Sequence, residues 1–283
     1  MADATKEWLD AQYDARAQVE DADAIITAWQ EESRAARAEF PPVEVRYGEH
    51  PRQAVDVFRG ADTPRPAPLV VFVHGGYWQA LDKETFGFLA MPFVEQGTVF
   101  ADVDYRLAPE VGIADIVADV RAAVAELARR ADELGAEPRG ITVIGHSAGG
   151  HLIAMLMATD WTAHGLPSDT VGAGVGISGL YDLEPLRRSY VNDEIGMTPE
   201  DAHDASPVHA TPTAPGPLLL TCGGDEPGEF DRQQQLLAQA WPTLSITILD
   251  QPGGSHFDAC DRLARPGTLR DAALALVRDR TIR

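Results

Sequence analysis

The 283-residue chain has only two cysteines and two lysines, and it has no long apolar run. Cys222 and Cys260 are too few for a disulfide framework, and their spacing is not that of a metal site. No segment reaches the roughly 18 apolar residues that a membrane span requires. The N-terminus lacks the basic segment and apolar core of a signal peptide. These absences favour a soluble protein of a reducing, cytoplasmic compartment.

Positive charge is scarce, because 23 Lys and Arg residues face 44 Asp and Glu residues, for a formal net charge of -21. Such a surface repels the phosphates of nucleic acids and anionic lipids, so we expect neither nucleic acid nor membrane as a partner. The partner that we expect is a small-molecule substrate, and a homodimer is left open. Hydrophobic residues make up 45% of the chain, which is enough for one sizeable core.

From residue 43 onward, segments with the pattern of strands alternate with segments with the pattern of helices. This alternation predicts an α/β fold in which helices cover both faces of a mostly parallel sheet. We expect residues 41–283 to form one domain, with residues 1–40 as an N-terminal helical segment packing on it. Residues 5–39 contain no glycine or proline, so a helix is expected there. The irregular stretch at about 181–215 is too long for a simple connection and is expected to form a cap or lid.

A G-x-S-x-G pattern, Gly145 to Gly149 around Ser147, separates an apolar strand segment from a strongly apolar helix segment. This pattern predicts a sharp strand-to-helix turn that exposes the serine hydroxyl above the sheet. A serine hydroxyl is a weak nucleophile that needs a base, and the base needs a third group to orient it. Downstream strand ends offer Asp225 and Glu226 as acids and then His256 as the base, in the order serine, acid, histidine.

The stretch "HGGYW" directly follows the buried strand segment "LVVFV". Backbone N–H groups at this position of the fold supply an oxyanion hole. We therefore expect the N–H groups of Gly76, Tyr77 and Ala148 to hold the negative charge that develops on a carbonyl oxygen. Trp78 and Tyr181, together with the Tyr77 ring, are expected to form an aromatic wall for the substrate. No metal-ligand cluster is visible, so we expect no metal and no cofactor.

Several motifs in combination resemble known families. "DYRLAPE" with "HGG" and "GHSAGG" resembles the hormone-sensitive-lipase-like branch of the α/β-hydrolases. "HGGYWQ", "GHSAGGHL", "SGLYDLEPL", "YVNDEIGMTPEDAHDASP" and "HF" look more like the kynurenine formamidase (arylformamidase) family. The resemblance covers roughly residues 43–280. It implies an α/β-hydrolase fold, nucleophile Ser147, base His256, oxyanion donors Gly76, Tyr77 and Ala148, and metal-free hydrolysis of N-formylkynurenine to kynurenine and formate.

The resemblance also favours one of the two candidate acids. In that family the acid lies three residues after a strand-end glycine, and a phenylalanine follows four residues later. Counting from Gly223 and counting back from Phe230 both lead to Glu226. Asp225 is the more usual residue type for a triad acid, and it stays the alternative.

Two other functions fit the same fold. A carboxylesterase for short-chain acyl or aryl esters would use every one of these residues, because the acyl-enzyme steps are the same. A non-catalytic binding protein on this fold is disfavoured, because such proteins commonly lose a member of the triad and here serine, acid and histidine are all present.

Overall fold

The computed structural model describes residues 4–279, so the outermost residues of the predicted ranges 1–40 and 41–283 lie outside it. Within the described residues, eight strands form one sheet in the order β1-β2-β4-β3-β5-β6-β7-β8. Only the pairs β1–β2 and β2–β4 are antiparallel, which confirms the mostly parallel sheet expected from the sequence. The strands are β1 Val43–Arg46, β2 Ala54–Phe58, β3 Leu69–Val73, β4 Val99–Val103, β5 Ile141–His146, β6 Val171–Ile177, β7 Leu218–Thr221 and β8 Ile246–Leu249.

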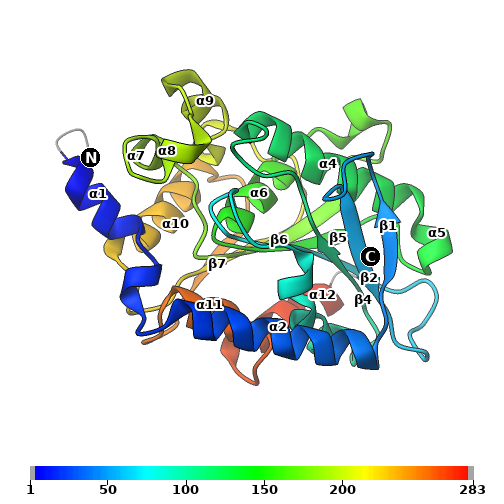
Figure 1. Ribbon diagram of the computed structural model, residues 1–283. Helices are drawn as coiled ribbons and strands as arrows, with labels where there is room; N and C mark the ends of the chain where they lie inside the picture. The colour runs from blue at the N-terminus through cyan, green and yellow to red at the C-terminus, as the bar shows by residue number, and fades with distance from the viewer. Residues whose placement is uncertain (1–3, 280–283) are drawn as a thin grey trace.

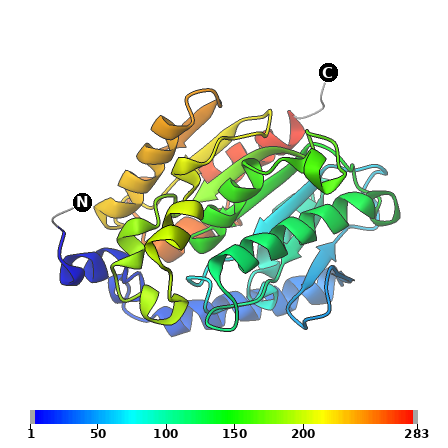
Figure 2. The same cartoon turned by 90° about the horizontal axis from the view of Figure 1, so that it is seen from above.

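Helices lie on both faces of the sheet, with α4, α6 and α10 on one face and α2, α11 and α12 on the other (Figure 1). Figure 2 shows α4, α6 and α10 lying across the sheet from above. The α-helices are α1 Lys6–Tyr13, α2 Ala22–Glu39, α3 Met91–Val94, α4 Ile113–Arg129, α5 Ala131–Leu134, α6 Ala148–Met157, α7 Glu184–Arg187, α8 Asn192–Ile195, α9 Pro199–Asp204, α10 Gly228–Ala240, α11 His256–Asp261 and α12 Thr268–Arg278. Short 3₁₀ helices are η1 Arg16–Gln18, η2 Lys83–Thr85, η3 Gly87–Ala90, η4 Trp161–His164 and η5 Pro207–His209.

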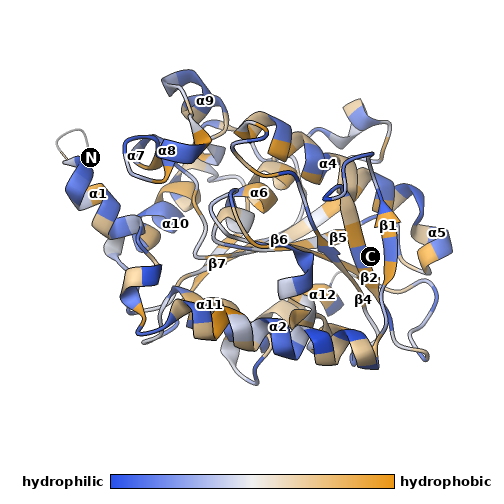
Figure 3. Cartoon of the chain, in the orientation of Figure 1, coloured by the Kyte–Doolittle hydropathy of each residue, from blue (hydrophilic) through white to orange (hydrophobic). Residues whose placement is uncertain are grey.

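Two apolar clusters fill the space between the sheet and its helices. Successive side chains of a strand point to opposite faces, so Val71 and Phe72 of β3 belong to different clusters. Every residue of β3 and β5 is buried, because helices cover both of their faces. Figure 3 shows this as hydrophobic central strands surrounded by helices with hydrophilic outer faces. From residue 4 to residue 279, no helix has the length and apolar character needed to cross a bilayer.

The N-terminal segment is helical but not continuous, so the expectation of one helix over residues 5–39 was wrong at residues 14–21. The Asp14 carboxylate accepts a hydrogen bond from the Ala17 N–H at 3.1 Å, and Asp21 caps α2 by accepting one from the Ala24 N–H at 2.9 Å. Such local side-chain bonds compete with the helix ladder. The break lets α1 pack against α7 and α10 while α2 runs along the opposite face of the sheet (Figure 1).

The segment expected to form a lid, residues 181–215, contains α7, α8, α9 and η5 and lies on the same side of the sheet as α6 and α10 (Figure 1). Its helices have four to six residues each. They are anchored by buried side chains such as Leu186 and Ala202, which join the same apolar cluster as Leu237 of α10. Its short helices were not visible in the polar sequence because each is shorter than two turns.

One buried carboxyl group makes the stability of the fold depend on pH. Asp102 in β4 lies opposite Asp56 of β2, and neither of its carboxyl oxygens has a hydrogen-bond partner among the described residues. Burial, followed by the charge of Asp56, raises the pKa of Asp102 well above its ordinary value. The folded chain therefore keeps this proton at pH values where the unfolded chain has released it.

Asp102→Asn tests this linkage, because asparagine has the same shape and does not ionise. Because the pKa of Asp102 is raised in the folded state, its protonated carboxyl contributes stability that is fully present below about pH 4, near the ordinary pKa. This stability is lost as the pH rises from there through the folded-state pKa. The free energy of unfolding of Asp102→Asn should therefore rise relative to the wild type by about 1.4 kcal/mol per pH unit in that window. Urea unfolding at pH 5, 6 and 7 measures the difference. A difference that is the same at all three pH values would contradict the prediction.

Candidate active site

Ser147 stands alone between β5 and α6, in the turn that the sequence predicts. Its backbone has φ 57° and ψ -120°, a conformation that residues with a side chain rarely adopt. The flanking glycines are required by space: a Cβ at Gly145 would collide with the Gly149 carbonyl, and a Cβ at Gly149 would collide with the Val73 carbonyl. The Ser147 N–H donates to the Ile177 carbonyl at 2.8 Å, which ties the turn to β6.

His256 and Glu226 form a buried pair at the ends of neighbouring strands. The distance from His256 Nδ1 to Glu226 Oε2 is 2.7 Å, and the two side chains are 5% and 1% exposed. His256 is the first residue of α11, after the loop that follows β8, and Glu226 lies in the turn that follows β7. A carboxylate can only accept, so Nδ1 carries the proton and Nε2 keeps the lone pair that a general base needs.

Two further donors hold the Glu226 carboxylate. Its Oε1 accepts hydrogen bonds from the Ser178 hydroxyl at 2.5 Å and from the Gly223 N–H at 2.6 Å. Ser178 is a site residue that no sequence motif predicted. Its signal is its position, directly after β6 at the carboxyl end of a central strand, where the functional groups of such sheets gather.

The loop after β3 lies against the Ser147 turn. A Cβ at Gly75 would come within 2.9 Å of both the His146 carbonyl and the Ser147 Cβ, so only glycine allows this approach. The next three residues, Gly76, Tyr77 and Trp78, have φ values of 102°, 48° and 58°. Ala148 begins α6, and the first amides of a helix have no partner within the helix. The predicted oxyanion donors Gly76, Tyr77 and Ala148 thus flank the serine from two sides.

The base of this loop is supported by residues that directly follow β4. The His74 ring stacks on the Tyr105 ring with centroids 4.3 Å apart, and its Nε2 lies 3.3 Å from Asp104 Oδ1. The Tyr105 hydroxyl donates to the His74 carbonyl at 2.8 Å, and Arg52 pairs with Asp104 at 2.7 Å. Asp104 and Tyr105 of the "DYR" stretch thus support the loop.

Known proteins are similar to the chain over most of its length. The BD-FAE family model matches residues 55–223. The kynurenine formamidase of Salmo salar is 33% identical over 84% of this chain and 82% of its own length. The chain belongs to the kynurenine formamidase family. The resemblance and the α/β-hydrolase fold expected from the motifs are confirmed.

Proteins outside the kynurenine formamidase family are also similar to this chain. Esterase LipC of Mycobacterium tuberculosis is 35% identical over 82% of this chain and 64% of its own length. The crystal structure of a protein described as a thioesterase, from Silicibacter sp. tm1040, matches with 31% identity and a TM-score of 0.82. The match covers 94% of this chain and 98% of that chain. The whole domain, and not the motifs alone, therefore follows a hydrolase fold.

In this member of the formamidase family, Glu226 and not Asp225 contacts His256. Asp225 points the other way, and its Oδ2 accepts the Gly254 N–H at 2.9 Å. The backbone strengthens this contact, because the Asp225 N–H donates to the Gly254 carbonyl at 3.1 Å. Asp225 thus holds the loop that carries His256, whereas Glu226 contacts the imidazole itself.

The predicted substrate-binding aromatics Trp78 and Tyr181 are both 0% exposed, which corrects the expectation that they form a wall. The left-handed backbone at Trp78 turns its indole inward, where Nε1 donates to His151 Nδ1 at 3.2 Å. The Tyr181 hydroxyl lies against Gly176 and Gly179, where an added Cβ would collide with it. Both rings are therefore part of the core beneath the site.

Two histidines near the serine are also structural. His146 Nε2 lies 3.0 Å from the His256 carbonyl oxygen, and His151 Nε2 lies 2.7 Å from the Ala205 carbonyl oxygen. Burial lowers the pKa of His146 well below its ordinary value and that of His151 to about 4. Both rings stay neutral near pH 7. Across residues 4–279, no three His, Cys, Asp or Glu side chains form a group able to hold a metal ion.

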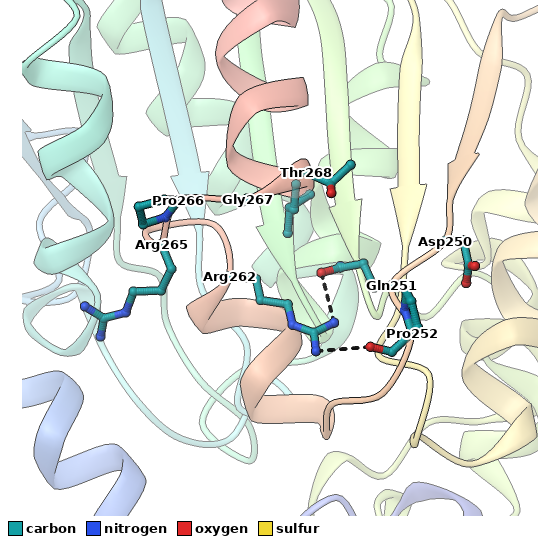
Figure 4. A pocket seen from close by; sticks show the side chains of 9 residues that line it. Asp250, Gln251, Pro252, Arg262, Arg265, Pro266, Gly267 and Thr268 are labelled. Carbon is teal, nitrogen blue, oxygen red and sulfur yellow. Dashed lines mark hydrogen bonds between the residues drawn. The ribbon is translucent and has the colours of Figure 1, made fainter.

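A cavity of about 270 Å³ lies behind the loop that precedes His256 (Figure 4). Arg262 crosses it and donates to the Gln251 side chain and to the Pro252 carbonyl, both at 3.4 Å. Neither Ser147 nor His256 lines this cavity. Its residues support the His256 loop from the side of α11 and α12.

Proposed function

We propose that the chain hydrolyses an aryl formamide, N-formylkynurenine, to kynurenine and formate, with Ser147 as nucleophile, His256 as base and Glu226 as acid. The observation that carries the proposal is the buried His256–Glu226 pair, packed against His146 next to Ser147, in a chain that is 33% identical to a kynurenine formamidase over most of its length. This pairing is what an acyl-transfer mechanism needs.

In the first half of the reaction, His256 Nε2 takes the Ser147 hydroxyl proton as Oγ bonds to the formyl carbon. The N–H groups of Gly76, Tyr77 and Ala148 stabilise the negative carbonyl oxygen. The carbon–nitrogen bond then breaks, and His256 gives its proton to the departing aniline nitrogen. Kynurenine leaves, and the formyl group stays on Ser147 as an ester.

In the second half, His256 removes a proton from a water molecule, whose oxygen bonds to the formyl carbon. The bond from carbon to Ser147 Oγ then breaks, formate leaves and His256 returns its proton to the serine. Each formamide cleaved therefore consumes one water molecule. Glu226 keeps the imidazole oriented and stabilises its charged form at both stages, without itself gaining a proton.

The close packing around the nucleophile supports a small acyl group. Ser147 is 3% exposed, and Tyr77 takes the place where a third glycine would leave more space. A formyl group carries a single hydrogen beyond its carbonyl, so it needs little room there. A carboxylesterase acting on short acyl or aryl esters is the second candidate, which the similarity to esterase LipC supports.

Substrate preference separates the two candidates. We expect kcat/KM for N-formylkynurenine to be at least about ten times that for p-nitrophenyl butyrate, and p-nitrophenyl acetate to react faster than the butyrate. Extra methylene groups would crowd the acyl side, and overpacking of this kind costs roughly 1–3 kcal/mol. Steady-state kinetics on the three substrates measures the order. Rapid butyrate hydrolysis without deformylation would leave the carboxylesterase as the function.

We also propose a reducing, cytoplasmic location, which the two free cysteines Cys222 and Cys260 support. The small-molecule substrate is the partner that the site requires. A homodimer stays a prediction.

A further inference from the structure

The carbonyl oxygen of Tyr13 joins three segments that are far apart in the chain. It accepts hydrogen bonds from the Tyr77 hydroxyl at 2.5 Å and from the Tyr190 hydroxyl at 3.2 Å, in addition to the Ala15 N–H at 3.0 Å. Tyr13 is the last residue of α1, where carbonyls have no partner within the helix. Tyr77 belongs to the loop after β3, residues 74–78, which we call the oxyanion loop, and Tyr190 belongs to the lid segment, residues 181–215.

The Tyr13 side chain fixes this carbonyl in place. It is 0% exposed, and its hydroxyl donates to Glu229 Oε2 at 2.8 Å and accepts from Gln233 Nε2 at 3.2 Å. Its ring meets the Phe230 ring edge-on at 6.2 Å, and the Phe230 ring lies 4.8 Å from the His256 ring. The end of α1 is thus anchored on α10, one side chain away from the proposed base.

The rest of α1, together with Ala4 before it, is tied to the lid segment. The Asp10 carboxylate accepts the Tyr190 N–H at 2.6 Å, and the Ala4 carbonyl accepts a hydrogen bond from the Arg188 guanidinium at 2.6 Å. Figure 1 shows α1 beside α7 and α10. We call residues 4–15 the N-terminal strap.

The oxyanion loop needs support of this kind. Tyr77 has φ 48°, in a region where a bulky side chain is strained and persists only when its surroundings hold it. The strap binds the far end of that side chain. Because the Tyr77 hydroxyl is bonded to the Tyr13 carbonyl, the side chain resists a change in the Tyr77 φ, which is one of the torsions that direct its N–H.

We propose that the N-terminal strap is a working part of the active site: the Tyr13 carbonyl, through the Tyr77 hydroxyl, positions the Tyr77 N–H as an oxyanion donor. The inference rests on the proposed role of that N–H. Tyr13 and the Tyr77 side chain are positioning groups, and the backbone N–H is the group that touches the reacting oxygen.

Tyr77→Phe is the direct test, because it removes the hydroxyl and keeps the ring. Tyr190→Phe is the matched control, because it removes the other hydroxyl on the same carbonyl and leaves the oxyanion loop untouched. Loss of a whole oxyanion donor lowers kcat by about 10²–10³-fold. A donor that is present but badly oriented should cost less, so we expect kcat of Tyr77→Phe to fall about 10-fold with KM changed less than about threefold. Tyr190→Phe should keep kcat within about twofold.

Both N-formylkynurenine and p-nitrophenyl acetate should be used, because the oxyanion loop serves both. If the wild type cleaves only the ester, the proposed substrate fails while the ester still reports on the strap. Amide hydrogen exchange over residues 75–78 should quicken in Tyr77→Phe and not in Tyr190→Phe, with thermal unfolding recorded for each. A Tyr77→Phe kcat within twofold of wild type on every substrate that the wild type cleaves, or an equal loss in Tyr190→Phe, would overturn the proposal.

Discussion

Ser147→Ala should leave a folded protein whose turnover is lower by about 10⁴- to 10⁶-fold, as expected when the nucleophile of a triad is removed. The change deletes one oxygen atom. The features that hold the turn remain, because they are the glycines at 145 and 149 and the bond from the residue 147 N–H to the Ile177 carbonyl at 2.8 Å. Circular dichroism and thermal unfolding should therefore match the wild type.

His256→Ala should lower turnover to a similar extent, and the double variant should be little worse than either one. Residues that act as a unit give such non-additive losses, because removing either one already stops the shared step. Steady-state rates with N-formylkynurenine and p-nitrophenyl acetate measure both effects. A Ser147→Ala protein that retains more than about a tenth of wild-type turnover would show that another group is the nucleophile.

Glu226→Gln should reduce kcat by about 10³- to 10⁴-fold. The reason lies in the hydrogen bonds of the acid. Oε1 accepts from the Ser178 hydroxyl and from the Gly223 N–H, so the carbonyl oxygen of glutamine must occupy this position. Its NH₂ group would then face His256 Nδ1, which has to accept instead of donating. The proton moves to Nε2, and the imidazole can no longer accept the serine proton.

Asp225→Asn is the matched control, and its kcat should fall only a few-fold. Asp225 Oδ2 accepts the Gly254 N–H at 2.9 Å, and the carbonyl oxygen of an asparagine accepts the same bond. The two variants each replace one carboxylate by an amide at neighbouring positions, so general electrostatic effects are similar. Comparing the kcat values of the two variants tests which carboxylate orients His256. A larger loss in Asp225→Asn would contradict the role proposed for Glu226.

The sheet and the serine turn could be predicted because their signals are local. The strand segments are short apolar runs bounded by turn residues, and their order alternates with helices. The failures have a physical cause as well. The helix break at residues 14–21 depends on whether Asp14 and Asp21 bond to nearby backbone N–H groups, which a composition without glycine or proline does not reveal.

Side-chain directions in the loops were less predictable. Trp78 and Tyr181 are aromatic residues next to active-site segments, and such a position is compatible with either a pocket wall or the core. The positive φ at Trp78 and the space left by the two glycines beside Tyr181 place both rings in the core. The role of Ser178 was not predictable either, since its contact with Glu226 spans 48 residues of chain.

The sequence by itself determined the family, the hydrolase fold, and the identities of Ser147 and His256 as candidate catalytic residues. These follow from short contiguous motifs, because the steric demands of the strand-to-helix turn fall on the glycines that lie two residues before and after the serine. Only the tertiary structure decided that Glu226 faces His256 while Asp225 holds the loop, and that the N-terminal strap contacts Tyr77. Which of two neighbouring carboxylates reaches the histidine depends on the direction that the turn gives each side chain, and that direction is set when distant strands, loops and helices pack together.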